Sequence, residues 1–332
     1  MTLTRRSALF ALMTPLMAAT LAATLAAPAS AQPAFPTKPV KIIVGFPAGG
    51  PLDAHARLLA DRLGQLLGQP VIVDYKAGAG GTVGADFVAK SDADGHTLLM
   101  ANTGTMTINP AIYPKNPYQT LRDFAPVART AMQPLAILVN PSVPANSIKE
   151  LVALAKKSPG KLNYGSAGNG GISHLVPEMF KSATGTFIVH IPYRGSAPAF
   201  TDLLAGQVQM MAESIPQAAQ YVKQGKLRAL AVTSRERSNA LPDTPTLIES
   251  GLKDFDVVGF YGVLAPAATP KSVVDKLAAA FKATLETPDI RSRMVAQGAD
   301  PAYLGPDDFT RYLGAEMPKW ARAVKDSGAR LD

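Results

Sequence analysis

Apolar residues follow two different periods along most of this chain. Short β-branched or aliphatic runs, typical of buried strands, occur at 40–44, 71–74, 97–101, 136–139, 189–193, 208–212, 227–233 and 257–264. Segments with helical spacing separate many of these runs, at 51–67, 84–90, 147–157, 172–183, 199–204, 272–285, 289–297 and 307–326. The alternation predicts an α/β fold with a mainly parallel sheet in each lobe, and ligand sites beyond the carboxyl ends of the strands.

A glycine-rich segment follows the strand that ends at Tyr164. It contains Gly165, Gly168, Gly170 and Gly171, and a helix begins directly after it. Glycine allows positive φ and close approach of a ligand, and a helix N-terminus favours anions. This turn is therefore predicted to bind an anion.

A second loop of the same kind follows the strand at 40–44. Gly49 and Gly50 form its turn, Pro51 takes the first helical position, and Asp53 follows in the first helical turn. After each helix come a glycine, a β-branched run and another loop of small residues, at 68–81 and again at 185–198. The repetition predicts two similar α/β lobes.

The N-terminal segment has the features of an export signal. Arg5 and Arg6 precede an apolar run over residues 7–27, and Ala29-Ser30-Ala31 is typical of a cleavage site. We expect residues 1–31 to be removed, so that the mature protein begins at Gln32. A retained membrane anchor is the alternative, and the paired arginines fit either general or twin-arginine export.

Composition excludes several kinds of chemistry. The chain has no cysteine, and its four histidines are too widely spaced for a zinc motif. The net charge of +8 is spread without a basic cluster, which argues against a nucleic-acid surface. Neither a dinucleotide fingerprint nor a phosphate-binding P-loop is present. We therefore expect no cofactor, no metal and no nucleic acid, and a soluble exported product.

Several polar side chains near the two loops have two interpretations each. Asp53 contacts either a ligand or its own helix N-terminus, where Arg57 pairs with it. His174 donates to a bound carboxylate or bonds local backbone. Glu213 contacts a donor group of a ligand or lies on the surface, and Arg194 either neutralises an anion or is solvated.

A hydrolase is the competing function from another class. Ser173 or Ser166 would act as the nucleophile with His174 as the base. Adjacent residues in a helix do not face each other, and no Gly-x-Ser-x-Gly elbow is present, so the sequence favours a binding protein without catalytic residues.

Ten ordered motifs cover nearly all of the chain from Phe35 onward. They are Phe35-Pro-x-Lys-Pro-Val, Phe46-Pro-Ala-Gly-Gly-x-x-Asp53, Leu67-Gly-Gln-Pro-Val-Ile-Val, Gly78-Ala-Gly-Gly81, Asp94-Gly-His-Thr-Leu-Leu99, Asp123-Phe-Ala-Pro-Val127, Pro159-Gly-Lys-Leu-Asn-Tyr-Gly-Ser-Ala-Gly168, His190-Ile-Pro-Tyr-Arg-Gly-Ser-Ala-Pro198, Gly225-Lys-Leu-Arg-Ala-Leu-Ala-Val-Thr233 and Leu241-Pro-Asp-x-Pro-Thr246. In these motifs the chain resembles the Bug family, the substrate-binding proteins of tripartite tricarboxylate transporters.

The resemblance implies a two-lobed periplasmic-binding-protein fold of the Venus-flytrap, type II-like kind. Residues 35–139 with 231–332 would form the first lobe, and residues 140–230 the second. The cleft would hold a small organic carboxylate, often through backbone groups and ordered water. A monomer in the periplasm would deliver that ligand to the membrane subunits of the transporter or present it to a sensor protein.

The resemblance also implies a set of ligand contacts, position by position. In the first lobe they are Phe46, Ala48, Gly49, Gly50, Asn102 and Thr103. In the second lobe they are Ser166, Gly168, Gly170, Gly171, His174, Gly195, Ser196 and Ala197, with Glu213 as a further candidate.

Three positions depart from the family pattern. Gly171 stands where Ser or Thr is common, Glu213 where Asp is usual, and residues 260–262 replace a segment that contains tryptophan. The first change enlarges the pocket and the second narrows it from another side. We therefore expect a mono- or dicarboxylate as the ligand and not citrate.

Overall fold

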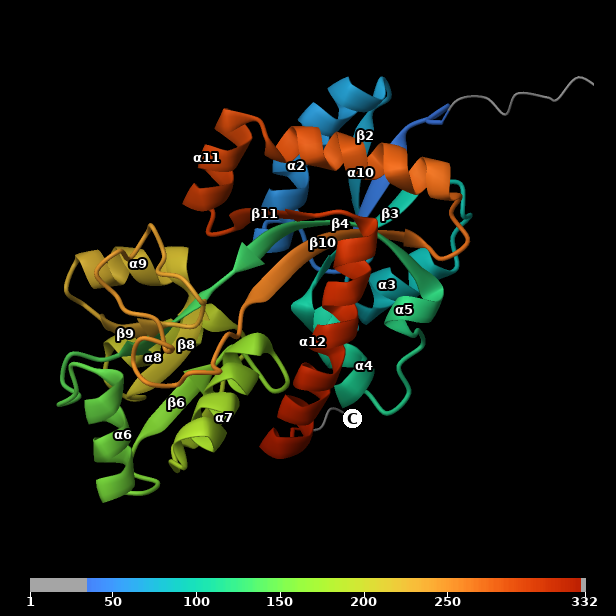
Figure 1. Cartoon of the computed structure of the whole chain (residues 1–332). Helices are drawn as coiled ribbons and strands as arrows, with labels where there is room; N and C mark the ends of the chain where they lie inside the picture. The colour runs from blue at the N-terminus through green and yellow to red at the C-terminus, as the bar shows by residue number, and fades with distance from the viewer. Residues whose placement is uncertain (1–34, 330–332) are drawn as a thin grey trace, which may run out of the picture. The chain divides into compact units, whose positions relative to one another are not determined.

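Two β-sheets form the framework of the protein (Figure 1). The computed structural model describes residues 35–329, and its strands and helices belong to one structural unit that begins at Lys38. The first sheet has six strands in the order β11-β4-β10-β3-β1-β2. They are β1 (Val40–Val44), β2 (Val71–Tyr75), β3 (Thr97–Asn102), β4 (Phe124–Gln133), β10 (Gly259–Pro266) and β11 (Asp300–Leu304).

The second sheet has five strands in the order β7-β6-β8-β5-β9. They are β5 (Leu135–Val139), β6 (Asn163–Ser166), β7 (Val189–Pro192), β8 (Met210–Ser214) and β9 (Arg228–Val232). The predicted similarity of the lobes is visible in the pairing. β1 lies between β2 and β3 and is parallel to both, and β6 lies in the same way between β7 and β8.

Both sheets are mixed, which corrects the prediction of mainly parallel sheets. β10 runs antiparallel to β3 and β4, and β11 antiparallel to β4. In the second sheet, β5 runs antiparallel to β8 and β9. The apolar pattern of a buried strand is the same for either direction, so the sequence carried no signal for the reversal.

Helices cover both faces of the sheets. They are α2 (Pro51–Leu67), α3 (Thr82–Ala89), α4 (Asn109–Ile112), α5 (Thr120–Asp123), α6 (Ile148–Lys157), α7 (Ile172–Thr184), α8 (Ser196–Leu204), α9 (Ile215–Lys223), α10 (Lys271–Leu285), α11 (Pro288–Ala296) and α12 (Pro306–Ser327), with a 3₁₀ turn η1 (Ala79–Gly81) and a π-helical turn η2 (Gly104–Ile108). In Figure 1, α2, α10 and α11 lie on one side of the first sheet and α12 on the other.

Helix starts follow the local sequence signals. Pro51 opens α2, and Gly68 ends it in the left-handed conformation at φ 73°. At α6, the Oγ of Ser147 accepts a hydrogen bond from the N–H of Glu150, and the Glu150 side chain accepts from the N–H of Asn146. These two contacts form a capping box in which the Glu150 side chain bonds the residue before the N-cap.

The chain passes from the first sheet to the second at a single residue, Pro134. β4 ends at Gln133 and β5 begins at Leu135, so the predicted first lobe of residues 35–139 included a strand that pairs in the second sheet. The chain returns between Val232 and Gly259, and β10 then inserts between β3 and β4. We keep the division into two lobes as a proposal, with these crossings as its boundaries.

Helix α12 packs in one hydrophobic core of each sheet. Phe309 and Leu313 pack in the core of the first sheet with Phe260, whereas Trp320 and Val324 pack in the core of the second sheet. A third element thus links the lobes beside the two strand crossings.

The structure bears on the prediction about membrane spans but not on the prediction of an export signal. Within residues 35–329, no helix is long and apolar enough to cross a membrane. The predicted export signal and its cleavage site lie outside the described residues.

Candidate functional site

Residues of both lobes line a cleft of about 390 Å³. The first lobe contributes Phe46, Gly80, Asn102, Thr103, Gly104, Asn109 and Tyr113. Gln133 and Gly259 come from the crossings, and the second lobe contributes Asn169, Gly170, Gly171 and Ile172. None of these lining residues has a charged side chain, so any anion held here is met by neutral donors.

Two larger hollows are lined by charged side chains of both signs. One, of about 790 Å³, lies between α7, α12 and residues 251–257 and is lined by three carboxylates, of Glu178, Asp254 and Asp326, and by three cations, of Lys253, Lys319 and Arg322. The other, of about 860 Å³, is lined by three aspartates and three lysines. Neither hollow includes one of the predicted contact residues, whereas the cleft includes five of them, so the cleft is the stronger candidate.

The cleft contains only part of the predicted set of contacts. Phe46, Asn102, Thr103, Gly170 and Gly171 line it. The remaining predicted residues are outside its lining, namely Ala48, Gly49, Gly50, Ser166, Gly168, His174, Gly195, Ser196, Ala197 and Glu213. Ligand contact by any of them stays a prediction.

The loop before α2 is closed by its own aspartate. The N–H of Gly49 donates to Asp53 Oδ2 at 2.7 Å, and Asp53 Oδ1 accepts from Arg57 Nε at 2.8 Å and from the Tyr75 hydroxyl at 2.7 Å. Burial would raise the pKa of Asp53, but these hydrogen bonds together lower it. The interpretation of Asp53 as a partner of its own helix N-terminus and of Arg57 is confirmed.

The loop before α7 is closed by neutral side chains. The N–H of Ala167 donates to Ser173 Oγ at 3.0 Å, that of Gly168 to Ser166 Oγ at 3.2 Å, and that of Gly170 to His174 Nδ1 at 3.0 Å. The N–H of Gly171, at the N-cap of α7, has no acceptor among residues 35–329. His174 thus bonds local backbone here, which is one of its two predicted roles.

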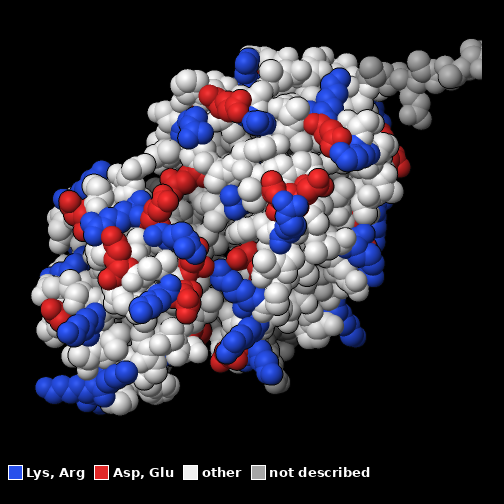
Figure 2. Space-filling model, viewed as in Figure 1, with Lys and Arg blue, Asp and Glu red and all other residues white. Residues whose placement is uncertain are grey.

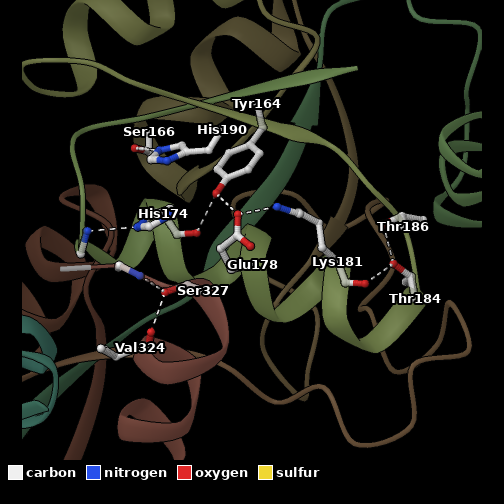
Figure 3. Close-up of polar contacts among 12 residues, drawn as sticks. Tyr164, Ser166, His174, Glu178, Lys181, Thr184, Thr186, His190, Val324 and Ser327 are labelled. Carbon is white, nitrogen blue, oxygen red and sulfur yellow. Dashed lines mark hydrogen bonds and ion pairs between the residues drawn. The ribbon is translucent and has the colours of Figure 1, made fainter. Parts of the chain in front are cut away.

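The stacked rings of Tyr164, His190 and His174 lie next to this loop (Figure 3). The ring of His190 lies 4.0 Å from that of His174 and 4.8 Å from that of Tyr164, centroid to centroid. His190 Nε2 lies 2.6 Å from Ser166 Oγ, and the Tyr164 hydroxyl donates to Glu178 Oε1 at 2.5 Å. Lys181 Nζ donates to the same oxygen at 2.6 Å.

Burial keeps both imidazoles neutral. It lowers the pKa of His190 to about 4, with a smaller contribution from the neighbouring His174 and Lys181. It also lowers the pKa of His174. A neutral His174 can accept at Nδ1 from Gly170, so the protonation state matches the geometry.

Glu213 is not among the residues that line the cleft. It is 8% exposed, accepts from Ser196 Oγ at 2.7 Å and from the N–H of Ser214 at 3.0 Å, and burial raises its pKa. The alternative of a surface carboxylate is wrong, because β8 places this side chain inside the second lobe. Ser196, another predicted contact, is its hydrogen-bond partner.

The serines considered for a hydrolase have other partners. Ser166 is fully buried and bonds His190, and Ser173 accepts from the backbone of Ala167. Neither serine lines the cleft. No group of three or more His, Asp or Glu residues suited to a metal ion occurs within residues 35–329.

Sequence reasoning missed more than half of the cleft lining. The missed residues are Gly80, Gly104, Asn109, Tyr113, Gln133, Asn169, Ile172 and Gly259. A usable signal existed for two of them: Gly80 lies in the small-residue loop at 77–81, and Asn169 lies between predicted glycines. Gln133 and Gly259 had no local signal, because only the crossing of the chain brings them to the cleft.

Comparison with known proteins settles the family. The model of the tripartite tricarboxylate transporter family receptor matches residues 55–329. The chain belongs to this family. It is 37% identical to the protein BugT of Bordetella pertussis over 305 residues, which are 92% of this chain and 93% of that protein.

Solved structures agree with the family in fold. A protein of R. palustris, Rpa4515, determined with adipate, is 33% identical, with a TM-score of 0.78 over 89% of this chain and 99% of that one. MatC from Rhodopseudomonas palustris, determined with bound malate, is 32% identical, with a TM-score of 0.73 over 87% of this chain and 100% of that one. The two-lobed α/β fold expected of the family receptor is confirmed.

Proposed function

We propose that this protein is a periplasmic receptor that captures a small organic mono- or dicarboxylate in the cleft of about 390 Å³. It delivers the ligand to the membrane subunits of a tripartite tricarboxylate-type transporter, and it works as a monomer. The observation that carries the proposal is the neutral cleft between the lobes, bordered by the N-terminus of α7. Family membership and relatives determined with adipate and malate support the ligand class.

The cleft offers neutral hydrogen-bond donors and no cation. The positive end of the α7 dipole and the Gly171 N–H favour one carboxylate. A tricarboxylate such as citrate would bring further negative charges into a cleft whose lining has no Lys or Arg to balance them. In Figure 2, Lys and Arg side chains are interspersed with Asp and Glu over the visible face, which fits a receptor for small ions better than a nucleic-acid surface.

A melting screen over aliphatic and aromatic carboxylates tests this function. At a hundredfold excess over its dissociation constant, a ligand stabilises the folded state by about 2.7 kcal/mol, which raises the melting temperature by several degrees. We expect such a shift from a mono- or dicarboxylate and none from citrate. A shift with citrate alone would overturn the ligand class, and no shift with any carboxylate would overturn the function.

A further inference from the structure

Asn102, at the end of β3, has an amide whose orientation is fixed by the backbone. Its Oδ1 accepts from the N–H of Thr105 at 2.9 Å and from Thr105 Oγ1 at 3.1 Å. A backbone N–H can only donate, so the atom that faces it must be the oxygen. The two N–H donors of Asn102 Nδ2 therefore point away from Thr105.

Asn109, at the start of α4, is fixed in the opposite sense. Its Nδ2 donates to the carbonyl oxygen of Gly80 at 2.9 Å and to Thr82 Oγ1 at 3.0 Å. A carbonyl can only accept, so the atom that faces Gly80 must be the nitrogen. The nearby hydroxyl of Tyr118 donates to the carbonyl of Thr105, which leaves Asn109 Oδ1 as an acceptor.

These two free amide ends open into the same cleft. Asn102 Nδ2 and Asn109 Oδ1 have no hydrogen-bond partner within residues 35–329. Neither atom is fully buried, so both remain accessible to a ligand. Asn109 is only 6% exposed, and both residues line the cleft. A chain of contacts joins them, from Asn102 Oδ1 through Thr105 Oγ1 to the Gly80 carbonyl and on to Asn109 Nδ2.

The geometry points to a ligand whose second end is a neutral group with both a donor and an acceptor. This inference rests on the proposed function, in which the carboxylate end is held by the α7 N-terminus. A hydroxyl or a primary amide pairs with Asn102 Nδ2 and Asn109 Oδ1 together. A second carboxylate only accepts hydrogen bonds, so it pairs with Asn102 Nδ2 but is repelled by Asn109 Oδ1. The cleft lining has no cation that would offset this repulsion. The ligand class is therefore a hydroxy-carboxylate or a dicarboxylic acid monoamide.

Titration calorimetry on matched ligands tests this class in the wild-type protein. Succinate is compared with its monoamide and with 4-hydroxybutyrate, and adipate with its monoamide and with 6-hydroxyhexanoate. We expect the amide or hydroxyl member of the preferred length to bind at least tenfold more tightly than the dicarboxylate. Equal or tighter binding of the dicarboxylate overturns this inference and leaves the proposed function intact. No binding by any member overturns this inference, and the melting screen over all carboxylates then decides the proposed function separately.

Two variants assign the preference to the two amides. Asn109→Ala removes the acceptor, so the tenfold preference should fall to near unity. Asn102→Asp keeps the oxygen that Thr105 contacts but replaces the donor, so dicarboxylates should weaken further and the preference should widen. Asn146→Ala, at an exposed position before α6, is the control and should leave both affinities unchanged. If both cleft variants keep the wild-type preference for the amide or hydroxyl ligand, Asn102 and Asn109 do not cause it. If Asn109→Ala does not fold, the comparison of ligands in the wild-type protein decides whether the ligand class is right.

Discussion

The two glycine-rich loops look alike in sequence and differ in what closes them. In the loop before α2, the N–H of Gly49 donates to a carboxylate, Asp53, which Arg57 holds in place. In the loop before α7, the acceptors are neutral, namely Ser166, Ser173 and His174. Bonds to a charged acceptor are roughly twice as strong as neutral ones. We therefore propose that a ligand carboxylate displaces the neutral acceptors of the loop before α7 more easily than it displaces Asp53 from the loop before α2.

Matched valine substitutions in the two loops should show this difference with the largest effect. Gly170 and Gly49 have φ angles of 74° and 86°, so valine strains both turns in a similar way. We expect Gly170→Val to weaken ligand binding at least about a hundredfold, because the bound carboxylate loses two charge-assisted hydrogen bonds, each worth about 1.5 to 3 kcal/mol. Gly49→Val should reduce stability but keep the affinity. Calorimetric titration of both folded variants measures this, and near wild-type affinity for Gly170→Val would place the anion elsewhere.

The pH dependence of stability tests the structure behind the loop before α7, where His190 is buried. The folded-state pKa of His190 is lowered to about 4, whereas an unfolded histidine titrates near 6.5. The unfolded chain therefore binds more protons, and stability is full above pH 6.5 and falls as the pH drops toward 4. After allowance for partial exposure, we expect a loss on the order of 2 kcal/mol relative to His190→Gln. Urea unfolding of both proteins at pH 7, 5.5 and 4.5 measures the difference, and the contribution of His55 cancels. Parallel pH profiles would show that His190 is not buried behind the loop as described.

Asp53→Asn gives the smallest expected effect, in the first loop. The variant keeps an acceptor for Gly49 but loses the charge that pairs with Arg57. We expect a loss of about 1 kcal/mol in the free energy of unfolding, since Arg57 is largely exposed. Ligand affinity should stay within about twofold of wild type. A large drop in affinity measured by calorimetry would mean that the first loop also binds the ligand.

The site was predictable where local sequence determines it. Glycine at positive φ and a helix start mark the turn before α7, and Gly170 and Gly171 do line the cleft. The same local rules marked Gly49 and Gly50, which lie outside the cleft lining, because a sequence pattern does not show which acceptor fills a turn. β4 was missed for a similar reason: Pro126, Arg129 and Thr130 interrupt its apolar pattern, and its place between β10 and β11 comes from pairing with distant strands.

The sequence by itself determined the family, the repeated strand-helix units and the two turns, because capping, glycine conformation and apolar periodicity act over a few neighbouring residues. Only the tertiary structure decided which residues of these turns border the cleft. The chain crosses between the sheets at Pro134, and the insertion of β10 between β3 and β4 joins segments that are more than a hundred residues apart. These long-range pairings bring Gln133 and Gly259 beside Asn102 and the start of α7. Burial of the apolar faces of both sheets drives that arrangement, and it depends on the whole chain.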